Sequence, residues 1–107
     1  MIYKIFRSNE WQDLQAQGDT AGAPIDSADD YIHFSTATQA QETADKHFAQ
    51  VEGLYLAAVD GAALGGDIKW EVSRGGAEFP HLYRRLQLDD VVWCLPLPLI
   101  DGRHKFP

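Results

Sequence analysis

The sequence predicts a single α+β domain over residues 1–107, in which a compact, mixed and mainly antiparallel (split) β-sheet is combined with two main helices. Apolar runs typical of strands outnumber the segments with helical spacing. These runs do not alternate regularly with helices, which excludes a doubly wound parallel fold. With 107 residues, of which 45% are hydrophobic, the chain has enough apolar side chains for one core but is too short for two.

The first elements are a strand and a short helix. Residues 2–6 are bulky, apolar and aromatic around one lysine, which is typical of a strand. We expect a helix over residues 8–17, capped by Ser8 and ended by Gly18, which readily adopts the left-handed conformation. Residues 19–30 are small, acidic and turn-prone, so they predict an ordered loop that could close over a site.

The middle of the chain contains a strand, a helix and a second strand. Residues 31–35 are predicted to be extended. Thr36 and Gln39 have the spacing of a capping box, and alanines at helical spacing follow them, so a helix with a small apolar face begins here. Residues 54–59 form a continuous apolar run, which indicates a central strand covered on both faces.

The last third contains further strands. Residues 68–72 alternate between apolar and polar side chains, and residues 79–86 return to the body of the protein after a glycine-containing loop. Residues 91–95 are the last predicted strand, because the prolines that follow should interrupt pairing. The polar tail over residues 101–107 is expected on the surface.

Composition restricts the classes of partner. The formal net charge of −7 disfavours a nucleic-acid polymer, which requires clustered basic residues, although Arg84 and Arg85 could bind the phosphate of a nucleotide. No apolar window approaches the roughly 20 residues of a membrane helix, and the N-terminus lacks a signal pattern, so we expect a cytoplasmic protein without membrane contact. Cys94, the single cysteine, lies in an apolar run typical of a buried structural thiol.

His33 is the first candidate site residue, because it lies between the apolar residues Ile32 and Phe34. Such a histidine is either a satisfied core residue or part of a pocket. Ser35 projects to the same face under the two-residue period of a strand, which favours a pocket. Ser35 or Thr36 must also cap the following helix, whose N-terminus could bind an anion.

Glu71 is the second candidate and has two interpretations. If it faces solvent, it is only the polar half of an alternating strand. If it faces inward, a buried unpaired carboxylate would be costly, so we expect a partner such as His81, Arg74 or Arg84. A carboxylate held in this way could orient a ribose hydroxyl, stabilise positive charge at a sugar carbon, or act as a general base.

Residues 79–83, with the sequence Phe-Pro-His-Leu-Tyr, are the third candidate. Pro80 restricts its own backbone and favours an extended residue before it, so the segment is stiff. His81 and Tyr83 then share one face and could form the wall of a ligand site. The alternative is a rigid turn that only packs the two large apolar side chains.

A metal site is a weaker interpretation. His33, His81 and Glu71 could form a set of two histidines and one carboxylate, but their spacing matches no metal-binding motif. His47 lies in the predicted helix and His104 in the tail, where both are expected to be solvated.

Several short strings together resemble a known bacterial family, the domain of unknown function 952. The strings are Ile2-Tyr3-Lys4, Trp11, Tyr31-Ile-His-Phe-Ser-Thr36, Gln39, Trp70-Glu71 and Phe79-Pro-His-Leu-Tyr83, and they extend over essentially the full chain. One departure precedes the second string, where the family usually has Gly-Phe and this chain has Asp30-Tyr31. The substitution removes a flexible glycine at the entrance of that strand.

The resemblance implies a fold, although the family has no established activity. The family is regarded as a remote relative of the ADP-ribosyltransferase fold, a small split β-sheet domain that binds NAD in a central cleft. The resemblance places Tyr3-Lys4 at the first ligand-contacting motif, residues 33–48 at the second, and Glu71 at the carboxylate. The first motif commonly contains a histidine, and this chain has Lys4 there.

The first functional hypothesis is an enzyme that binds NAD or an ADP-ribose-like nucleotide as its substrate, for ADP-ribosyl transfer or glycosidic cleavage. The candidate catalytic residues are Glu71, His33 and His81, and the candidate ligand-binding residues are Lys4, Ser35, Thr36, Arg74, Tyr83 and Arg84. The alternative is a non-catalytic module that binds a small ligand or a partner protein through the same cleft. A metal-dependent hydrolase is the third hypothesis.

Overall fold

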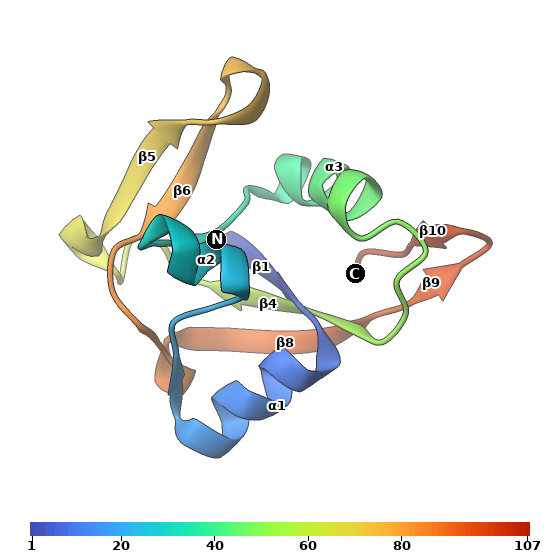
Figure 1. The fold of residues 1–107 in the computed structure, drawn as a ribbon, viewed down its shortest axis with the longest axis horizontal. Coiled ribbons are helices and arrows are strands. Elements are labelled where there is room, and N and C mark those ends of the chain that lie inside the picture. Colours follow the sequence, from blue (N-terminus) through green and yellow to red (C-terminus); the bar gives the residue numbers. More distant parts are fainter.

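A three-stranded antiparallel sheet in the order β1–β4–β8 forms the centre of the molecule (Figure 1). The computed structural model describes residues 1–107, apart from the side chain of Arg74. The strands are β1 (Ile2–Phe6), β4 (Leu54–Val59) and β8 (Val91–Leu97). β4 lies in the middle, and all its residues except Tyr55 are buried. The prediction of a central strand covered on both faces is therefore confirmed.

A second antiparallel sheet, in the order β3–β6–β5, contributes the hairpin that projects from the central sheet in Figure 1. Its strands are β3 (Ile32–His33), β6 (Glu78–Leu82) and β5 (Ile68–Val72). The two sheets are joined where Tyr3 and Ser35 exchange two backbone hydrogen bonds of 2.8 Å. The strand predicted over residues 31–35 is thus divided, because His33 pairs with β6 whereas Ser35 pairs with β1.

Two of the three α-helices follow the predicted capping signals. They are α1 (Ser8–Gln17) and α3 (Ala37–His47). In α3 the Thr36 hydroxyl accepts from the Gln39 amide at 3.2 Å, and the Gln39 side chain accepts from the Thr36 amide at 3.0 Å, which confirms the capping box. Gly18 ends α1 with φ 83°, as expected, but Arg7 rather than Ser8 is the N-cap residue.

The prediction of a loop over residues 19–30 is wrong, because this segment forms a strand and a helix. It forms the strand β2 (Asp19–Thr20), which pairs with β7 (Leu86–Gln87), and the helix α2 (Pro24–Asp29). Pro24 suits the first turn of a helix, and the Asp26 carboxylate accepts from the Ala23 amide at 2.8 Å. The buried residue of α2 is Asp26, so the helix has no apolar periodicity to recognise.

The C-terminal part also differs from its prediction. β8 continues through Pro96, which pairs opposite Tyr55, because an edge strand tolerates a residue without an amide proton. The tail forms a small hairpin of β9 (Leu99–Ile100) and β10 (Arg103–His104). His104 is only 4% exposed, and its Nε2 lies 2.8 Å from the Val51 carbonyl oxygen. The expectation of a solvated His104 is therefore wrong, whereas His47 is exposed as predicted.

Three short 3-10 turns complete the chain, namely η1 (Gly65–Asp67), η2 (Arg74–Gly76) and η3 (Leu88–Asp90). Apolar side chains from both sheets and from α1 share the main core, which includes Phe6, Leu14, Ile32, Phe34, Val59 and Leu82. A second core beneath α3 includes Ile5, Ala44, Leu54, Leu56 and Leu97. Burying each large apolar side chain contributes about 2 kcal/mol. Within the described residues, none of the helices has the length and apolar character needed to cross a bilayer.

Candidate functional site

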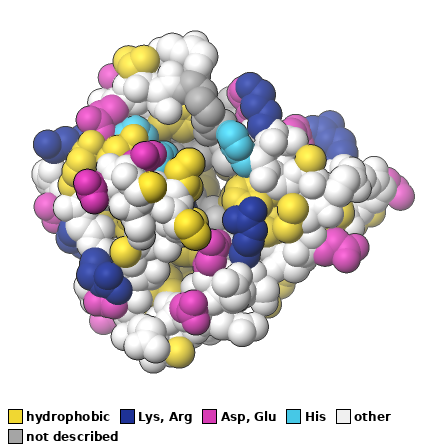
Figure 2. All heavy atoms as spheres, viewed as in Figure 1, with side chains coloured by type: hydrophobic (Ala, Val, Ile, Leu, Met, Phe, Trp, Pro, Cys, Tyr) yellow, Lys and Arg dark blue, Asp and Glu magenta, His cyan; other side chains and the backbone are white. Residues whose placement is uncertain are grey.

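The candidate site lies on the face of the β3–β6–β5 sheet that points away from the main core. Ile32 and Leu82 enter the core, so the residues that alternate with them, His33 and His81, project from the opposite face. The two imidazoles form a cross-strand pair with ring centroids 5.3 Å apart. Figure 2 shows histidine side chains beside acidic ones over β6, next to α2.

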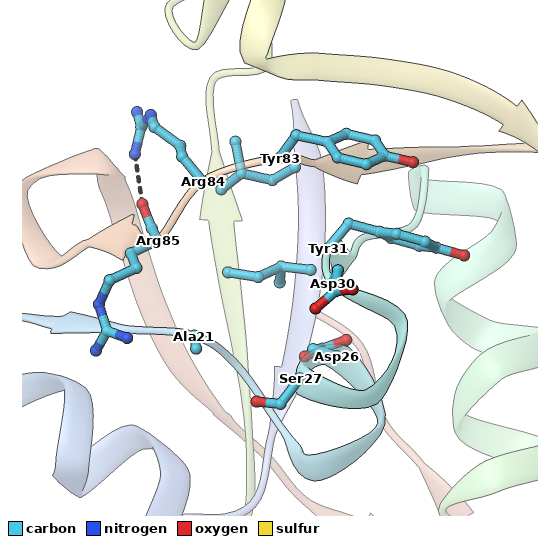
Figure 3. A pocket seen from close by; sticks show the side chains of 10 residues that line it. Ala21, Asp26, Ser27, Asp30, Tyr31, Tyr83, Arg84 and Arg85 are labelled. Carbon is cyan, nitrogen blue, oxygen red and sulfur yellow. Dashed lines mark hydrogen bonds between the residues drawn. The ribbon is translucent and has the colours of Figure 1, made fainter.

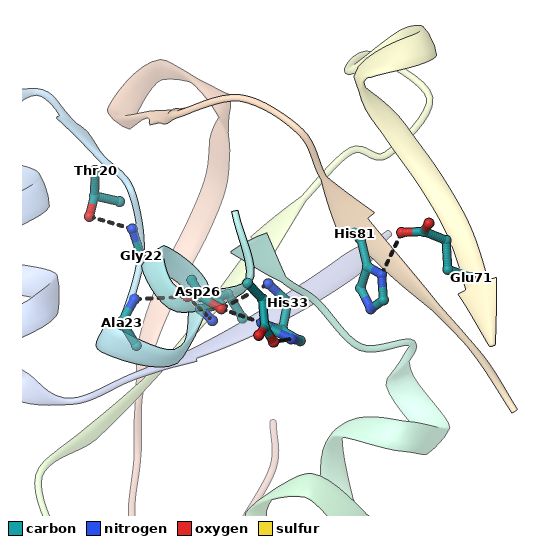
Figure 4. Close-up of polar contacts among 9 residues, drawn as sticks. Thr20, Gly22, Ala23, Asp26, His33, Glu71 and His81 are labelled. Carbon is teal, nitrogen blue, oxygen red and sulfur yellow. Dashed lines mark hydrogen bonds and ion pairs between the residues drawn. The ribbon is translucent and has the colours of Figure 1, made fainter. Parts of the chain in front are cut away.

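Glu71 links the side chains that the sequence placed on one face. Its Oε1 accepts from the Tyr83 hydroxyl at 2.6 Å. The same oxygen lies 2.8 Å from Nδ1 of His81, a contact drawn in Figure 4. These hydrogen bonds, that of Tyr83 first, lower the pKa of the Glu71 carboxyl. The same carboxylate raises the pKa of Tyr83 to about 12. Because an ionised carboxylate only accepts, Nδ1 of His81 is the donor, and the tautomer of the neutral ring is fixed.

The other ring nitrogen of His81 is unusual. The residue is 2% exposed, and within the described part of the chain its Nε2 has no hydrogen-bond partner. With the proton on Nδ1, Nε2 of the neutral ring is an acceptor. Buried polar atoms are nearly always paired in folded proteins, so an unpaired one needs an explanation, of which a catalytic role is one. His81 is therefore the imidazole of the pair that has an unpaired acceptor.

Asp26 organises the other half of the site. Its side chain is fully buried, and its Oδ2 accepts from Nζ of Lys4 and from the Ala23 amide, both at 2.8 Å. Oδ1 accepts from the His33 amide at 3.0 Å and lies 2.5 Å from Nδ1 of His33 (Figure 4). Burial alone would raise the pKa of this carboxyl, but the His33 hydrogen bonds and the Lys4 charge outweigh burial and lower the pKa to about 2.

His33 differs from His81 in its partners. Its Nδ1 faces Asp26, and its Nε2 lies 3.0 Å from Oδ2 of Asp29. Carboxylates only accept, so both ring nitrogens can donate at once when the ring is protonated. The site therefore pairs an imidazole that faces a carboxylate at each ring nitrogen with one whose Nε2 is unpaired. Sequence reasoning missed Asp26 and Asp29, because nothing in the sequence of residues 19–30 links these carboxylates to a histidine on the next strand.

Tyr31 completes the cluster and was also missed. Its ring stacks on the His81 ring, with centroids 4.2 Å apart and an angle of 29° between the planes. It also lies 4.7 Å from the His33 ring and 5.2 Å from the Tyr83 ring. Burial and the nearby Asp29 raise the pKa of Tyr31. In sequence, an aromatic residue at a strand entrance looks the same whether it enters the core or a site.

A pocket of about 290 Å³ adjoins the imidazole cluster (Figure 3). It is lined by Ala21, Asp26, Ser27, Asp30, Tyr31, Ile32, Leu82, Tyr83, Arg84 and Arg85. Its volume is at the lower limit for small-molecule sites. The imidazoles do not line it, but Tyr31, Tyr83 and Asp26 belong to both the pocket and the cluster. Figure 3 shows the two tyrosine rings side by side, pointing away from Arg84 and Arg85.

Other predicted ligand-binding residues have side chains that already bond to neighbouring elements of the fold. Lys4 is buried, with its ammonium group on the same Asp26 carboxylate that His33 contacts. The Ser35 hydroxyl lies 3.3 Å from that of Thr43 in α3, and Thr36 caps the same helix. Their side chains therefore bond to α3, whereas His33, His81, Glu71 and Tyr83 come together as predicted.

The arginines also differ from one another. Arg84 donates from both terminal nitrogens to Asp90, at 2.9 and 3.1 Å, and from Nε to Asp67 at 3.2 Å, so it clamps η1 and η3 to the chain after β6. Arg74 was predicted to bind ligand, but its side chain lies outside the described residues.

Two further chemistries find little support in the geometry. Burial raises the pKa of the Cys94 thiol to about 11, which makes it a poor nucleophile. Among the described side chains, no group of three or more His, Cys, Asp or Glu residues is arranged to hold a metal ion.

Comparisons with known proteins agree on one family. The model of the family "Protein of unknown function (DUF952)" matches residues 5–94. None of the curated proteins matches the chain. The crystal structure of protein CC0527 from Caulobacter crescentus is 48% identical, with a TM-score of 0.92 over 97% of this chain and 92% of that chain. The solution NMR structure of CC0527 gives a TM-score of 0.87, also at 48% identity, over 96% of this chain and 89% of that chain. Because the family model matches most of the sequence, this chain belongs to the DUF952 family of proteins of unknown function.

Proposed function

We propose that this protein is an enzyme that binds NAD or an ADP-ribose-like nucleotide and acts at its glycosidic bond, by cleavage or by ADP-ribosyl transfer. The observation that carries the proposal is the meeting of His33 and His81, each paired with a carboxylate, beside a pocket with two tyrosines. Facing imidazoles whose carboxylate partners differ suit general acid–base chemistry, which contributes about 10²–10⁴ in rate.

The arrangement of the sheets supports the same proposal. Two small antiparallel sheets meet at the bridge between Tyr3 and Ser35. A split sheet of this kind is a feature of the ADP-ribosyltransferase fold, and we propose that the family shares it. The net charge of −7 disfavours a polynucleotide, so a single nucleotide is the better candidate.

In the proposed reaction the bond between ribose C1 and the nicotinamide nitrogen breaks, and nicotinamide leaves with the electron pair. The positive charge that develops at C1 is stabilised by the Glu71 carboxylate, which Tyr83 and His81 keep ionised. In hydrolysis, a water oxygen bonds to C1 and its proton passes to Nε2 of His81. His33 acts by holding the Asp26 and Asp29 carboxylates at its two ring nitrogens, and Lys4 acts indirectly by holding Asp26.

The test combines binding with one substitution. The wild type should bind ADP-ribose and convert NAD, followed by calorimetric titration and by chromatography of released nicotinamide. Glu71→Gln should lower kcat by roughly a hundredfold while affinity changes little. Glu78→Gln is the matched control, because Glu78 is an exposed residue at the start of β6 in the same hairpin. Absence of binding at millimolar ADP-ribose, together with no product from NAD over hours, would rule out the proposal.

A non-catalytic binding module is the second candidate, and one observation favours it. The position where related folds commonly have a ligand-contacting histidine holds Lys4, whose ammonium group is turned inward to Asp26. On this alternative, Glu71→Gln would change only the affinity for the ligand, and no product would form with either variant.

A further inference from the structure

We infer that the Tyr31 side chain is a movable cover over a ligand subsite at His81, and that this subsite takes a ligand group that donates a hydrogen bond to Nε2. A sugar hydroxyl or an amide N–H is the class of group that fits. The inference rests on the proposed function for the identity of the ligand. Whether Tyr31 covers His81 can be tested without any ligand.

The first step of the argument is the state of Nε2. Glu71 accepts from Nδ1 at 2.8 Å, so Nε2 of the neutral ring is the acceptor. This nitrogen is buried and unpaired among the residues that the structure describes. The His81 residue is 2% exposed, so nothing can reach Nε2 unless a neighbouring group moves.

The second step identifies Tyr31 as the group that moves. Its ring covers one face of the imidazole at 4.2 Å, whereas the backbones of His81 and His33 are fixed by pairing between β6 and β3. The Tyr31 backbone is anchored by a 3.2 Å hydrogen bond from its amide to the Asp26 carbonyl oxygen. Its hydroxyl makes no hydrogen bond to any described residue, so the side chain can rotate without breaking one.

The third step is the chemistry of the space that Tyr31 would leave. Besides the His33 and Tyr83 rings, the groups near Tyr31 include the acceptor Nε2 and the carboxylates of Asp29 and Glu71. An excess of acceptors favours a ligand group that donates, and it disfavours a phosphate at this position. Tyr31 also lines the neighbouring pocket, so a ligand seated there would contact the cover directly.

The test measures access to Nε2 with diethyl pyrocarbonate, which acylates unprotonated imidazole nitrogens and can be mapped by mass spectrometry. In the wild type His81 should react slowly, as buried His104 should, whereas exposed His47 reacts fast. Tyr31→Ala should accelerate acylation of His81 about tenfold or more by opening the site locally. Tyr31→Phe should not, because it keeps the ring.

His104 reports on folding within the same sample, because unfolding of Tyr31→Ala would expose it as well. In that case Tyr31→Leu is used instead of Tyr31→Ala, because leucine fills more of the space than alanine but cannot stack on the imidazole. Reaction of His81 in the wild type as fast as His47, or no acceleration in the open variants, would overturn the inference.

A second arm adds ADP-ribose to Tyr31→Ala. Protection of His81, with His47 unaffected, supports the subsite. If calorimetry shows that ADP-ribose binds but His81 is not protected, the subsite assignment is wrong while the proposed function stands. If no nucleotide binds, the proposed function fails, and the ligand-free arm alone decides whether Tyr31 covers His81.

Discussion

The buried ion pair between Lys4 and Asp26 leads to a prediction about stability. Asp26→Asn keeps the size of the side chain but removes the charge that neutralises Lys4, whose side chain is 8% exposed. Removing one partner of a buried pair typically costs about 3–5 kcal/mol, because the other charge stays buried. We expect a loss of about 3 kcal/mol, which should lower the urea midpoint by more than about 1 M.

The pKa of Asp26 gives an independent magnitude. The pKa of the Asp26 carboxyl is about 2 in the folded protein and 3.8 in the unfolded chain. This difference corresponds to roughly 2 kcal/mol of stabilisation. The folded pKa is the lower one, so this stabilisation is fully present above pH 4 and is lost as the pH falls towards 2. Wild-type stability should therefore decline over that window, and the Asp26→Asn protein should show less of this decline.

The matched control is Asp45→Asn, which removes an exposed ion pair with Arg103. Such pairs contribute less than about 1 kcal/mol, so urea unfolding at pH 7 should barely change. Equal destabilisation by the two substitutions would refute the reasoning, since it would mean that burial of the Lys4–Asp26 pair has no energetic consequence. The reasoning would also be refuted if the stability of Asp26→Asn declined towards pH 2 as steeply as that of the wild type and of the control.

Three further predictions test other features. Glu71→Gln should lower the pKa of Tyr83 from about 12 towards 10, because the carboxylate that raises it is gone; an unchanged tyrosinate absorbance during alkaline titration would contradict this. Arg84→Ala should lower the free energy of unfolding by about 1 kcal/mol, and the melting temperature by about 4 °C, because the bidentate contact with Asp90 is lost. Arg85 has a single exposed partner, so Arg85→Ala should leave the melting temperature unchanged. Gly18→Ala should cost about 1 kcal/mol in urea unfolding, because φ there is 83°, whereas Gly66→Ala, at an ordinary φ in open space, should cost clearly less.

The sequence correctly predicted those elements that depend on interactions between residues close together in the chain. The capping box of Thr36 and Gln39, the glycine after α1 and the continuous apolar run of β4 all act over short distances, so their patterns are legible without tertiary contacts. The two-residue period of a strand likewise placed His81 and Tyr83 on one face, and both contact Glu71.

Two of the errors share one cause, because each involves a polar residue that is buried by a distant partner. α2 was taken for a loop since its buried residue is Asp26, which Lys4 of β1 and His33 of β3 make tolerable. His104 was expected in solvent, but the Val51 carbonyl oxygen pairs with it across the fold. Patterns of hydrophobicity cannot reveal such residues, because their burial depends on partners brought together only by folding.

The sequence alone determined an α+β chain in which two histidine-containing strings supply side chains suited to chemistry, because side-chain period and capping are local properties. Only the tertiary structure decided that His33 and His81 pair across adjacent strands, that Asp26 anchors the first, and that Tyr31 covers the second. These contacts join residues separated along the chain, and their energies depend on burial, which exists only once both sheets and α2 are assembled.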